Sequence, residues 1–372
     1  MSTISTPAKK RIDSIDIMRG IVMIVMALDH TRDFFSDSSF NPSDLSRAST
    51  ALFLTRFITH YCAATFVFLA GTGAFLSFTR GKTKWEACNF LVSRGFWLII
   101  LELTIINWGW GDGYFLQVIW AIGVSMIILG VMVFLPLPVI TGVGLLLIFG
   151  HDIFDKVRPD SFSETTGTLW RILHVQSNVN ILGQDVFILY PLIPWVGVMM
   201  AGYGFGKLYT LDAVIRKKYL LAIGSAAILL FVLIRSFNFY GDPSLWRDQG
   251  SWVRTVLSFI NVSKYPPSLD YLLITLGPVI ILLAFLEDIQ NSVTQVLVIF
   301  GRVALFYYIL HLYLIHGLSL LVAKITGATN GLFFSLPVVY AVWALVIIIL
   351  YFPCRWFMKY KREHKYWWLS YL

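Results

Sequence analysis

The amino-acid sequence predicts an all-α polytopic integral membrane protein with about ten transmembrane helices and both termini in the cytoplasm. Hydrophobic residues make up 57 % of the 372 residues and charged residues only 13 %, whereas a soluble domain carries about 25 % charged residues. The mean hydropathy of +0.73 indicates a chain that lies mostly in lipid. Lys and Arg gather in alternate connections between the apolar segments, and this alternation predicts the orientation.

The apolar segments give the order of the predicted helices, because about 20 mainly apolar residues are needed to cross a bilayer. They lie at about 15–35, 57–79, 90–107, 114–134, 137–153, 187–209, 219–237, 270–287, 296–323 and 333–353. Longer connections at about 36–56, 154–186 and 238–269 are expected outside. We therefore expect one membrane domain at 14–353, between a basic cytoplasmic tail at 1–13 and a basic, aromatic tail at 354–372 that contacts the anionic inner leaflet.

The sequence disfavours several classes of function, because it lacks the motifs that they require. The net charge of +8 reflects cytoplasmic Lys and Arg, and no nucleic-acid motif is present. Cys62, Cys88 and Cys354 are too far apart for a disulfide framework or a metal site. Because the membrane histidines form no i,i+4 pair and no HExxH motif, we expect no metal.

The first apolar segment carries an unusual number of ionisable residues. "IMRGIVMIVMALDHTRDFF" (17–35) includes Arg19, Asp29, His30 and Asp33. Eleven residues of helix turn about 1100°, so Arg19 and His30 share one face at a separation of about 16 Å. Asp33 follows His30 by three residues and can reach its ring, as Asp16 can reach Arg19. Such groups usually face a bundle interior or a wet cavity.

Further candidates lie in other segments. His60 stands near the outer start of the second segment, where it either takes part in catalysis or caps the helix. His311 and His316 are five residues apart, so they point to different sides of a helix and only one can face a common site. We favour His311, as a residue that binds substrate. Glu102 is expected to pair with an arginine or to line the cavity, because an isolated charge in lipid is costly.

Four residues are candidates for contacting substrates. Arg302 is a second cation that can bind phosphate. Lys264, in the stiff stretch "KYPP", contacts either substrate or lipid headgroups. Trp108 and Trp110, in "NWGWGDGY" (107–114), are either a platform for a sugar ring or part of an interfacial aromatic belt.

Several stretches together resemble a known family. The Arg-x10-His spacing resembles the acyltransferase-3 superfamily, and "RIDSIDIMRGIVMIVMALDHTRDFF" (11–35), "THYCAATFVFLAGTGAFL" (59–76), "YPLIPWVGVMMAGYGFGKL" (190–208), "KYPPSLDYLLITLGP" (264–278) and "GRVALFYYILHLYLIH" (301–316) resemble the heparan-α-glucosaminide N-acetyltransferase-like family. These stretches are most similar to those of the bacterial members of the family. The resemblance implies a multi-pass acyltransferase of the bacterial inner (plasma) membrane, not one that transfers amino-acyl groups.

The resemblance also implies the chemistry. Acetyl-CoA would bind as co-substrate from the cytoplasm, and a histidine would catalyse transfer of the acetyl or acyl group to a sugar or glycoconjugate outside. His30 matches the acyltransferase-3 position, whereas His60 matches a histidine of bacterial relatives, so both remain candidate bases. Asp33 or Asp29 would orient His30. Arg19 and Arg302 would bind the phosphates of the acyl-CoA. Direct transfer is favoured over an acyl-histidine intermediate, and a homodimer is left open.

A proton-coupled membrane transporter is the alternative function. Buried Asp, His and Arg residues also form proton relays. Transporters often consist of repeated halves with helices broken at matching positions, and the sequence has no such internal symmetry. We therefore favour the enzyme.

Overall fold

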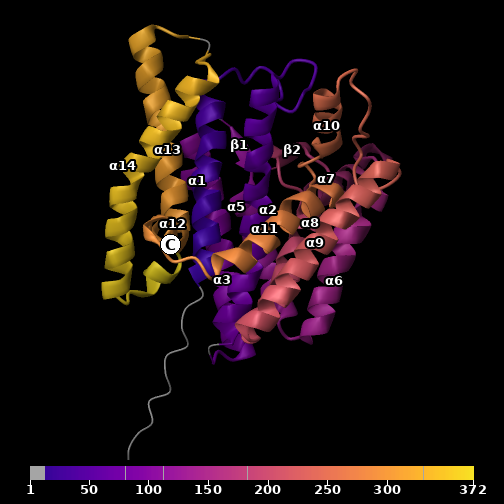
Figure 1. The fold of residues 1–372 in the computed structure, drawn as a ribbon, viewed down its shortest axis with the longest axis vertical. Helices are drawn as coiled ribbons and strands as arrows, with labels where there is room; N and C mark the ends of the chain where they lie inside the picture. The colour runs from indigo at the N-terminus through magenta and orange to yellow at the C-terminus, as the bar shows by residue number, and fades with distance from the viewer. Residues whose placement is uncertain (1–12, 80, 112, 182, 330) are drawn as a thin grey trace, which may run out of the picture.

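The computed structural model describes residues 13–79, 81–111, 113–181, 183–329 and 331–372. Within these ranges the chain is a bundle of helices with a small sheet near one end (Figure 1). The helices are α1 (Asp13–Phe35), α2 (Thr50–Phe78), α3 (Lys84–Leu101), α4 (Asn107–Trp110), α5 (Val118–Met132), α6 (Leu137–Gly150), α7 (Glu164–His174), α8 (Leu192–Phe205), α9 (Ala213–Phe237), α10 (Trp252–Ile260), α11 (Leu269–Leu286), α12 (Ser292–Arg302), α13 (Ala304–Thr326) and α14 (Leu336–Glu363).

The prediction of a polytopic helical membrane protein is confirmed, but the count of ten spans is not supported. In the described ranges, seven helices are long and apolar enough to cross a bilayer. The first helix carries several charges, while α5, α8 and α12 have 15, 14 and 11 residues, fewer than the 18 of the shortest candidate span. The most apolar spans include peripheral ones: only 22 % of α9 and 17 % of α14 is buried, against 67 % of α11. Apolar side chains on α9 and α14 are therefore left to face lipid.

Two predicted helical segments differ from the structure. The segment 296–323 is divided at Val303, where backbone angles of −121° and 37° separate α12 from α13. Residues 114–116 and 187–188 are not helical but belong to a three-stranded sheet in the order β1–β3–β2, with β1 (Tyr114–Leu116), β2 (Ser177–Ile181) and β3 (Gln184–Ile188). The strands β1 and β3 are parallel, and β2 and β3 form an antiparallel hairpin. Short aromatic and β-branched runs do not distinguish strand from helix by pattern alone.

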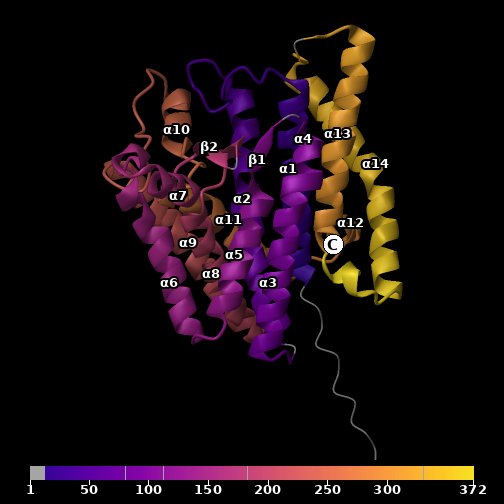
Figure 2. The same ribbon diagram turned by 180° about the vertical axis from the view of Figure 1, so that it is seen from behind.

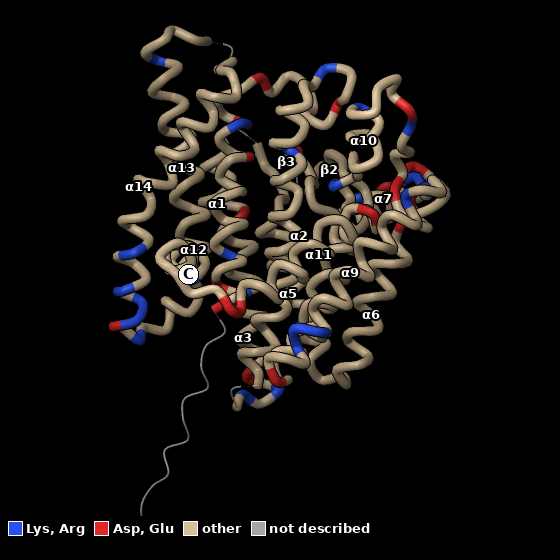
Figure 3. The backbone as a smooth tube through the Cα atoms, viewed as in Figure 1, with Lys and Arg blue, Asp and Glu red and all other residues tan. Residues whose placement is uncertain are grey.

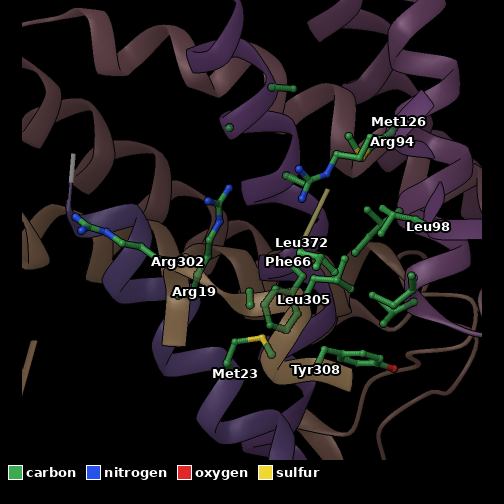
Figure 4. Close-up of a pocket in the computed structure, with 18 of the residues that line it drawn as sticks. Arg19, Met23, Phe66, Arg94, Leu98, Met126, Arg302, Leu305, Tyr308 and Leu372 are labelled. Carbon is green, nitrogen blue, oxygen red and sulfur yellow. The ribbon is translucent and has the colours of Figure 1, made fainter. Parts of the chain in front are cut away.

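The helix α1 lies at the centre, against α2, α12, α13 and α14. Glycines bring it very close to α12: a Cβ atom on Gly20 would lie 2.0 Å from the carbonyl oxygen of Leu297, and one on Gly301 would lie 1.8 Å from that of Asp16. Small residues allow such close approach of helix backbones. This packing places Arg19 on α1 beside Arg302 at the end of α12 (Figure 4).

The charged residues are distributed unequally between the two ends of the bundle. At the lower end in Figure 3, basic residues gather at the end of α14 and near the start of α9, and acidic residues are seen at both ends of the bundle. The expected boundary between 353 and 354 falls inside the continuous helix α14. Beyond α14 the chain folds back beside α12 (Figure 2), where Arg94 of α3 donates to the Ser370 carbonyl at 2.6 Å. Residues 1–12 of the expected N-terminal tail lie outside the described ranges.

Candidate functional site

Two cavities follow one another along α1. The first, the arginine chamber, has a volume of about 340 Å³ and is lined by Arg19, Arg94 and Arg302 among others (Figure 4). The second, the histidine chamber, has a volume of about 560 Å³ and is lined by His30 and Asp29 among others. The two chambers share the lining residues Met26, Phe66, Val118 and Tyr308. These shared residues, called here the common wall, lie between the arginines of the first chamber and His30 of the second.

The arginine chamber presents cations from four helices, α1, α3, α12 and α14. The guanidinium of Arg19 lies 3.8 Å from Asp16, as the i,i+3 spacing predicts, and donates to the Leu69 carbonyl at 2.8 Å. Arg302 pairs with Asp13 and Asp16 at 3.0 and 3.1 Å. Gly73 faces Arg19, because a Cβ at this position would lie 2.7 Å from its guanidinium nitrogen. The glycine thus leaves the space that the guanidinium occupies.

His30 belongs to a chain of two imidazoles and a carbonyl. Its Nδ1 lies 2.7 Å from Nε2 of His311, and Nδ1 of His311 lies 3.0 Å from the Tyr307 carbonyl oxygen. A carbonyl only accepts, so in neutral His311 the hydrogen is on Nδ1 and the lone pair on Nε2. Nδ1 of His30 must then donate, which leaves the lone pair of neutral His30 on Nε2. This tautomer can accept a proton from a group in the histidine chamber.

The carboxylates near His30 are paired with arginines. Asp29 is 2.8 Å from Arg32 and also forms an ion pair with Arg56 of α2. Asp33 is 2.5 Å from Arg32, and among the described residues no hydrogen bond joins Asp33 to His30. The expected contact between them does not form because Asp33 turns to the adjacent guanidinium, while His311 takes Nδ1 of His30. His311, on α13, therefore holds the position that the sequence had assigned to a carboxylate.

His60 lies in a different setting from His30. It is 4 % exposed and lines a neighbouring cavity of about 280 Å³ with Asn41, Asn261 and Ser263. Its backbone carbonyl accepts from the Tyr271 hydroxyl at 2.6 Å, and its ring nitrogen Nδ1 has no hydrogen-bond partner among the described residues. The two cavities share Arg56 and Lys264, so His60 is near the histidine chamber without lining it.

Lys264 and Tyr265 form part of the histidine chamber ahead of α11. Lys264 is 8 % exposed, and its ammonium lies 5.1 Å from the centre of the Tyr265 ring. Burial, the largest influence, raises the pKa of Tyr265, but the charges of Lys264 and Arg56 together bring that pKa below its ordinary value. The Lys264 side chain thus contributes a positive charge to the lining of the chamber.

The predicted tryptophan pair is divided between two environments. The Trp110 ring lines the histidine chamber, edge-on to His30 with ring centres 4.8 Å apart. Trp108 is 71 % exposed and is not among the described lining residues of either chamber. His316 bonds to the Gly109 carbonyl at 2.9 Å instead of facing His30. Of the two histidines on α13, His311 is thus the one beside His30.

Glu102 does not pair with an arginine in the way the sequence suggested. It lies in a π-helical turn, Glu102–Ile106, and accepts the backbone N–H of Trp120 at 3.0 Å. A carboxylate at the first turn of a helix satisfies backbone donors and complements the helix dipole. Glu102 therefore caps α5, which begins at Val118 of the common wall.

Several charged lining residues were not among the site residues predicted from the sequence. Arg32 and Arg56 line the histidine chamber, and Arg94 and Lys361 line the arginine chamber. The capping signal at Ser49, whose hydroxyl accepts from the Leu52 amide, starts α2 at Thr50 instead of 57. Recognising this cap would have placed Arg56 inside a membrane helix, where an arginine is a functional candidate.

These features define a class of protein: a polytopic helical membrane protein with an arginine-lined cavity and a histidine-lined cavity on either side of a narrow wall. The family model described as "Heparan-alpha-glucosaminide N-acetyltransferase, catalytic" matches residues 11–246. Because this is more than half of the chain, the protein belongs to that family and is of the membrane acetyltransferase class. A search of curated proteins found no match. The matched range includes Arg19, His30 and His60, whereas Lys264, Arg302 and His311 lie beyond it.

Proposed function

We propose that the protein transfers an acetyl group from cytoplasmic acetyl-CoA to a sugar or glycoconjugate on the opposite side of a bacterial inner membrane. The observation that carries this proposal is the arrangement of the two chambers along α1. Arg19 lines one chamber, His30 lines the next, and the common wall belongs to both. An acyl group that crosses this wall moves from a site for anions to a site for proton transfer.

The arginine chamber suits the donor. Coenzyme A carries several phosphate charges, and arginine binds phosphate through charge-assisted hydrogen bonds in a fixed geometry. Lys361, in the last turn of α14, lines the chamber, and basic residues gather at this end of α14 (Figure 3). By the positive-inside rule we expect this end to face the cytoplasm. About 16 Å of helix separates Arg19 from His30. This length is comparable with an extended pantetheine arm. One molecule of acetyl-CoA can therefore place its phosphates near Arg19 and its thioester near His30.

His30 supplies the base. Nε2 of neutral His30 accepts the proton of an acceptor amine or hydroxyl as its nitrogen or oxygen attacks the thioester carbonyl. The carbon–sulfur bond then breaks, and the thiolate of coenzyme A takes the proton from the imidazolium. His311 orients the ring through Nδ1, as the third member of a catalytic triad does. We prefer this direct transfer to an acyl-histidine, because both substrates have a chamber of their own.

The acceptor would bind in the histidine chamber. Lys264, Arg56 and Trp110 offer hydrogen-bond donors and an aromatic face, which are the features that bind sugars and their anionic substituents. His60 would act indirectly, since it lines the adjoining cavity. The proposal can be tested because it gives His30 a direct role and His60 an indirect one.

The decisive experiment measures release of free coenzyme A by purified protein with acetyl-CoA and a panel of amino sugars and glycoconjugates. His30→Gln should lower turnover by about 10²- to 10⁴-fold, the usual contribution of a general base, without weakening acetyl-CoA binding. His60→Gln should have a smaller effect, and His364→Gln, in the C-terminal tail, serves as the matched control. If His30→Gln turns over like His364→Gln, His30 is not the base.

A proton-coupled transporter remains the competing function, since the same buried ion pairs can relay protons. Vesicles that contain the protein separate the two functions. A transporter would move solute and protons in the absence of any thioester, whereas the enzyme should deliver acetylated product only when acetyl-CoA is supplied on the side of the arginine chamber.

A further inference from the structure

A cluster of metal-binding residue types lies outside both chambers. His151 is in a 3-10 turn, His151–Phe154, that follows α6; Asp155 comes directly after this turn, and His174 is the last residue of α7. Each residue offers one ligand atom, and these atoms all lie within 4.8 Å of one another. The Nε2 atom of His174 is already 3.2 Å from a carboxylate oxygen of Asp155.

The two imidazoles are buried without enough hydrogen bonds. The side chains of His151 and His174 are 0 % and 2 % exposed. Neither ring nitrogen of His151, nor Nδ1 of His174, forms a hydrogen bond of ordinary geometry among the described residues, although Nδ1 of His151 lies 3.1 Å from a carboxylate oxygen of Asp152. The Pro267 backbone also lies near the His151 ring. Because buried polar atoms are normally satisfied, two neighbouring imidazoles in this state call for a further ligand.

The surroundings of the cluster resemble those that support a metal. A carboxylate oxygen of Asp152 lies 3.1 Å from Nδ1 of His151, and carboxylates in this position orient metal-binding imidazoles. The other oxygen of Asp152 accepts the backbone N–H of Leu269 at 3.0 Å, so Asp152 is itself held in place. Asp155 is 20 % exposed, which leaves one side open for entry of an ion.

We propose that His151, His174 and Asp155 bind a zinc ion, with water as the fourth ligand. Two imidazoles and one carboxylate suit Zn²⁺, whereas Mg²⁺ and Ca²⁺ prefer sites made only of oxygen. Zinc–nitrogen bonds of about 2.0–2.1 Å require the ligand atoms to close up modestly from their present spacing. The ring centres of the two histidines, 5.6 Å apart, allow this through side-chain rotation.

The zinc ion would hold the end of α6 against the end of α7. Gln176, two residues beyond His174, lines the histidine chamber, and the β2–β3 hairpin that follows contributes Phe187 to the same lining. The start of α11 is tied to the same region through Asp152 and Leu269. The ion would therefore fix the wall of the histidine chamber that the sheet forms.

The test compares zinc content and thermal stability, because neither depends on the proposed acetyl transfer. Protein purified without a histidine tag should retain about one zinc ion per chain, measured by mass spectrometry of the metal. His174→Ala and Asp155→Asn should lose it, whereas His316→Ala, which also removes one histidine, should keep it. A chelator should lower the melting temperature of wild type and His316→Ala but not that of His174→Ala.

Two outcomes would overturn the proposal. The first is wild-type protein that holds no zinc after equilibration with the ion, at a concentration where a peptide zinc finger is saturated. The second is equal zinc content in wild type, His174→Ala and Asp155→Asn. Asp155→Asn changes a partly exposed residue and keeps its size, so the test stands even if His174→Ala does not fold. Failure of the acetyl-transfer assay would leave these measurements unaffected.

Discussion

The arginine chamber and the histidine chamber differ in the polar groups that line them. In its described lining the arginine chamber has Arg19, Arg94, Arg302 and Lys361 among mainly apolar side chains and no side-chain carboxylate. Asp13 and Asp16, which pair with two of these arginines, lie outside the lining. The histidine chamber has carboxylates and cations together, with amide side chains between them. The first is suited to hold a polyanion. The second, where charges already neutralise one another, is suited to move a proton without binding a strong counter-ion.

The largest effect is expected when the central carboxylate of the histidine chamber is removed, because this abolishes the charge balance that distinguishes it from the arginine chamber. Asp29→Asn would leave Arg32 and Arg56 buried without their shared anion. Breaking a buried ion pair from one side costs about 3–5 kcal/mol, so this variant should unfold at a clearly lower temperature in detergent.

Asp33→Asn provides the matched control for Asp29→Asn. The Asp33 side chain is 38 % exposed and pairs only with Arg32 among the described residues. Exposed pairs are worth about 0–1 kcal/mol, so the melting temperature should stay close to that of wild type. Equal destabilisation by the two variants would mean that Asp29 does not organise the chamber.

The orientation of His30 can be tested through its neighbour. His311→Ala removes the acceptor for Nδ1 of His30 and frees the other tautomer. Turnover should fall by about 10- to 100-fold, less than for loss of a base, while the KM for acetyl-CoA stays unchanged. His311→Asn, whose amide oxygen can accept, should recover part of this loss. A similar fall for both variants together with a raised donor KM would point to misfolding of α13.

Binding of the donor, acetyl-CoA, should depend on the arginine chamber. Arg19→Ala removes a charge-assisted contact worth about 1.5–3 kcal/mol, which raises the KM for acetyl-CoA by about 10- to 100-fold with little change in kcat. Arg302→Ala should have a smaller effect, because two carboxylates already engage Arg302. Assays at increasing acceptor concentration provide the check, since the KM for the acceptor should not change.

The smallest expected effect concerns the acceptor. Lys264→Met keeps the length of the side chain and removes its charge from the histidine chamber. We expect the KM for the acceptor to rise about three- to tenfold, the value of roughly one hydrogen bond, with acetyl-CoA binding unchanged. A change confined to the donor KM would place Lys264 on the wrong side of the common wall.

Much of the fold follows from hydrophobic pattern, because apolar runs of about 20 residues have few alternatives in lipid. The pairing of Arg19 with Asp16 was also predictable, since it depends on spacing within one helix. Helical spacing led us to expect Arg19 and His30 in one cavity, whereas the structure places them in two chambers that share the common wall.

Contacts between helices could not be predicted in the same way. The bond between His30 and His311 joins residues 281 positions apart, and the pairing of Asp29 with Arg56 depends on how α2 packs on α1. Local spacing favoured Asp33 as the partner of His30, but tertiary packing supplied a second histidine. The cluster of His151 and His174 was missed for the same reason: spacing rules for metals consider residues close in sequence.

The common wall has a consequence for the membrane itself. Three of its side chains, Met26, Phe66 and Val118, have no group that can carry a proton or hydrate an ion. An open water-filled passage here would short-circuit the electrochemical gradient of the cell. For the proposed transfer, an apolar septum of this kind would admit a neutral, flexible arm and exclude ions, so the acetyl group would cross the bilayer without leakage of ions.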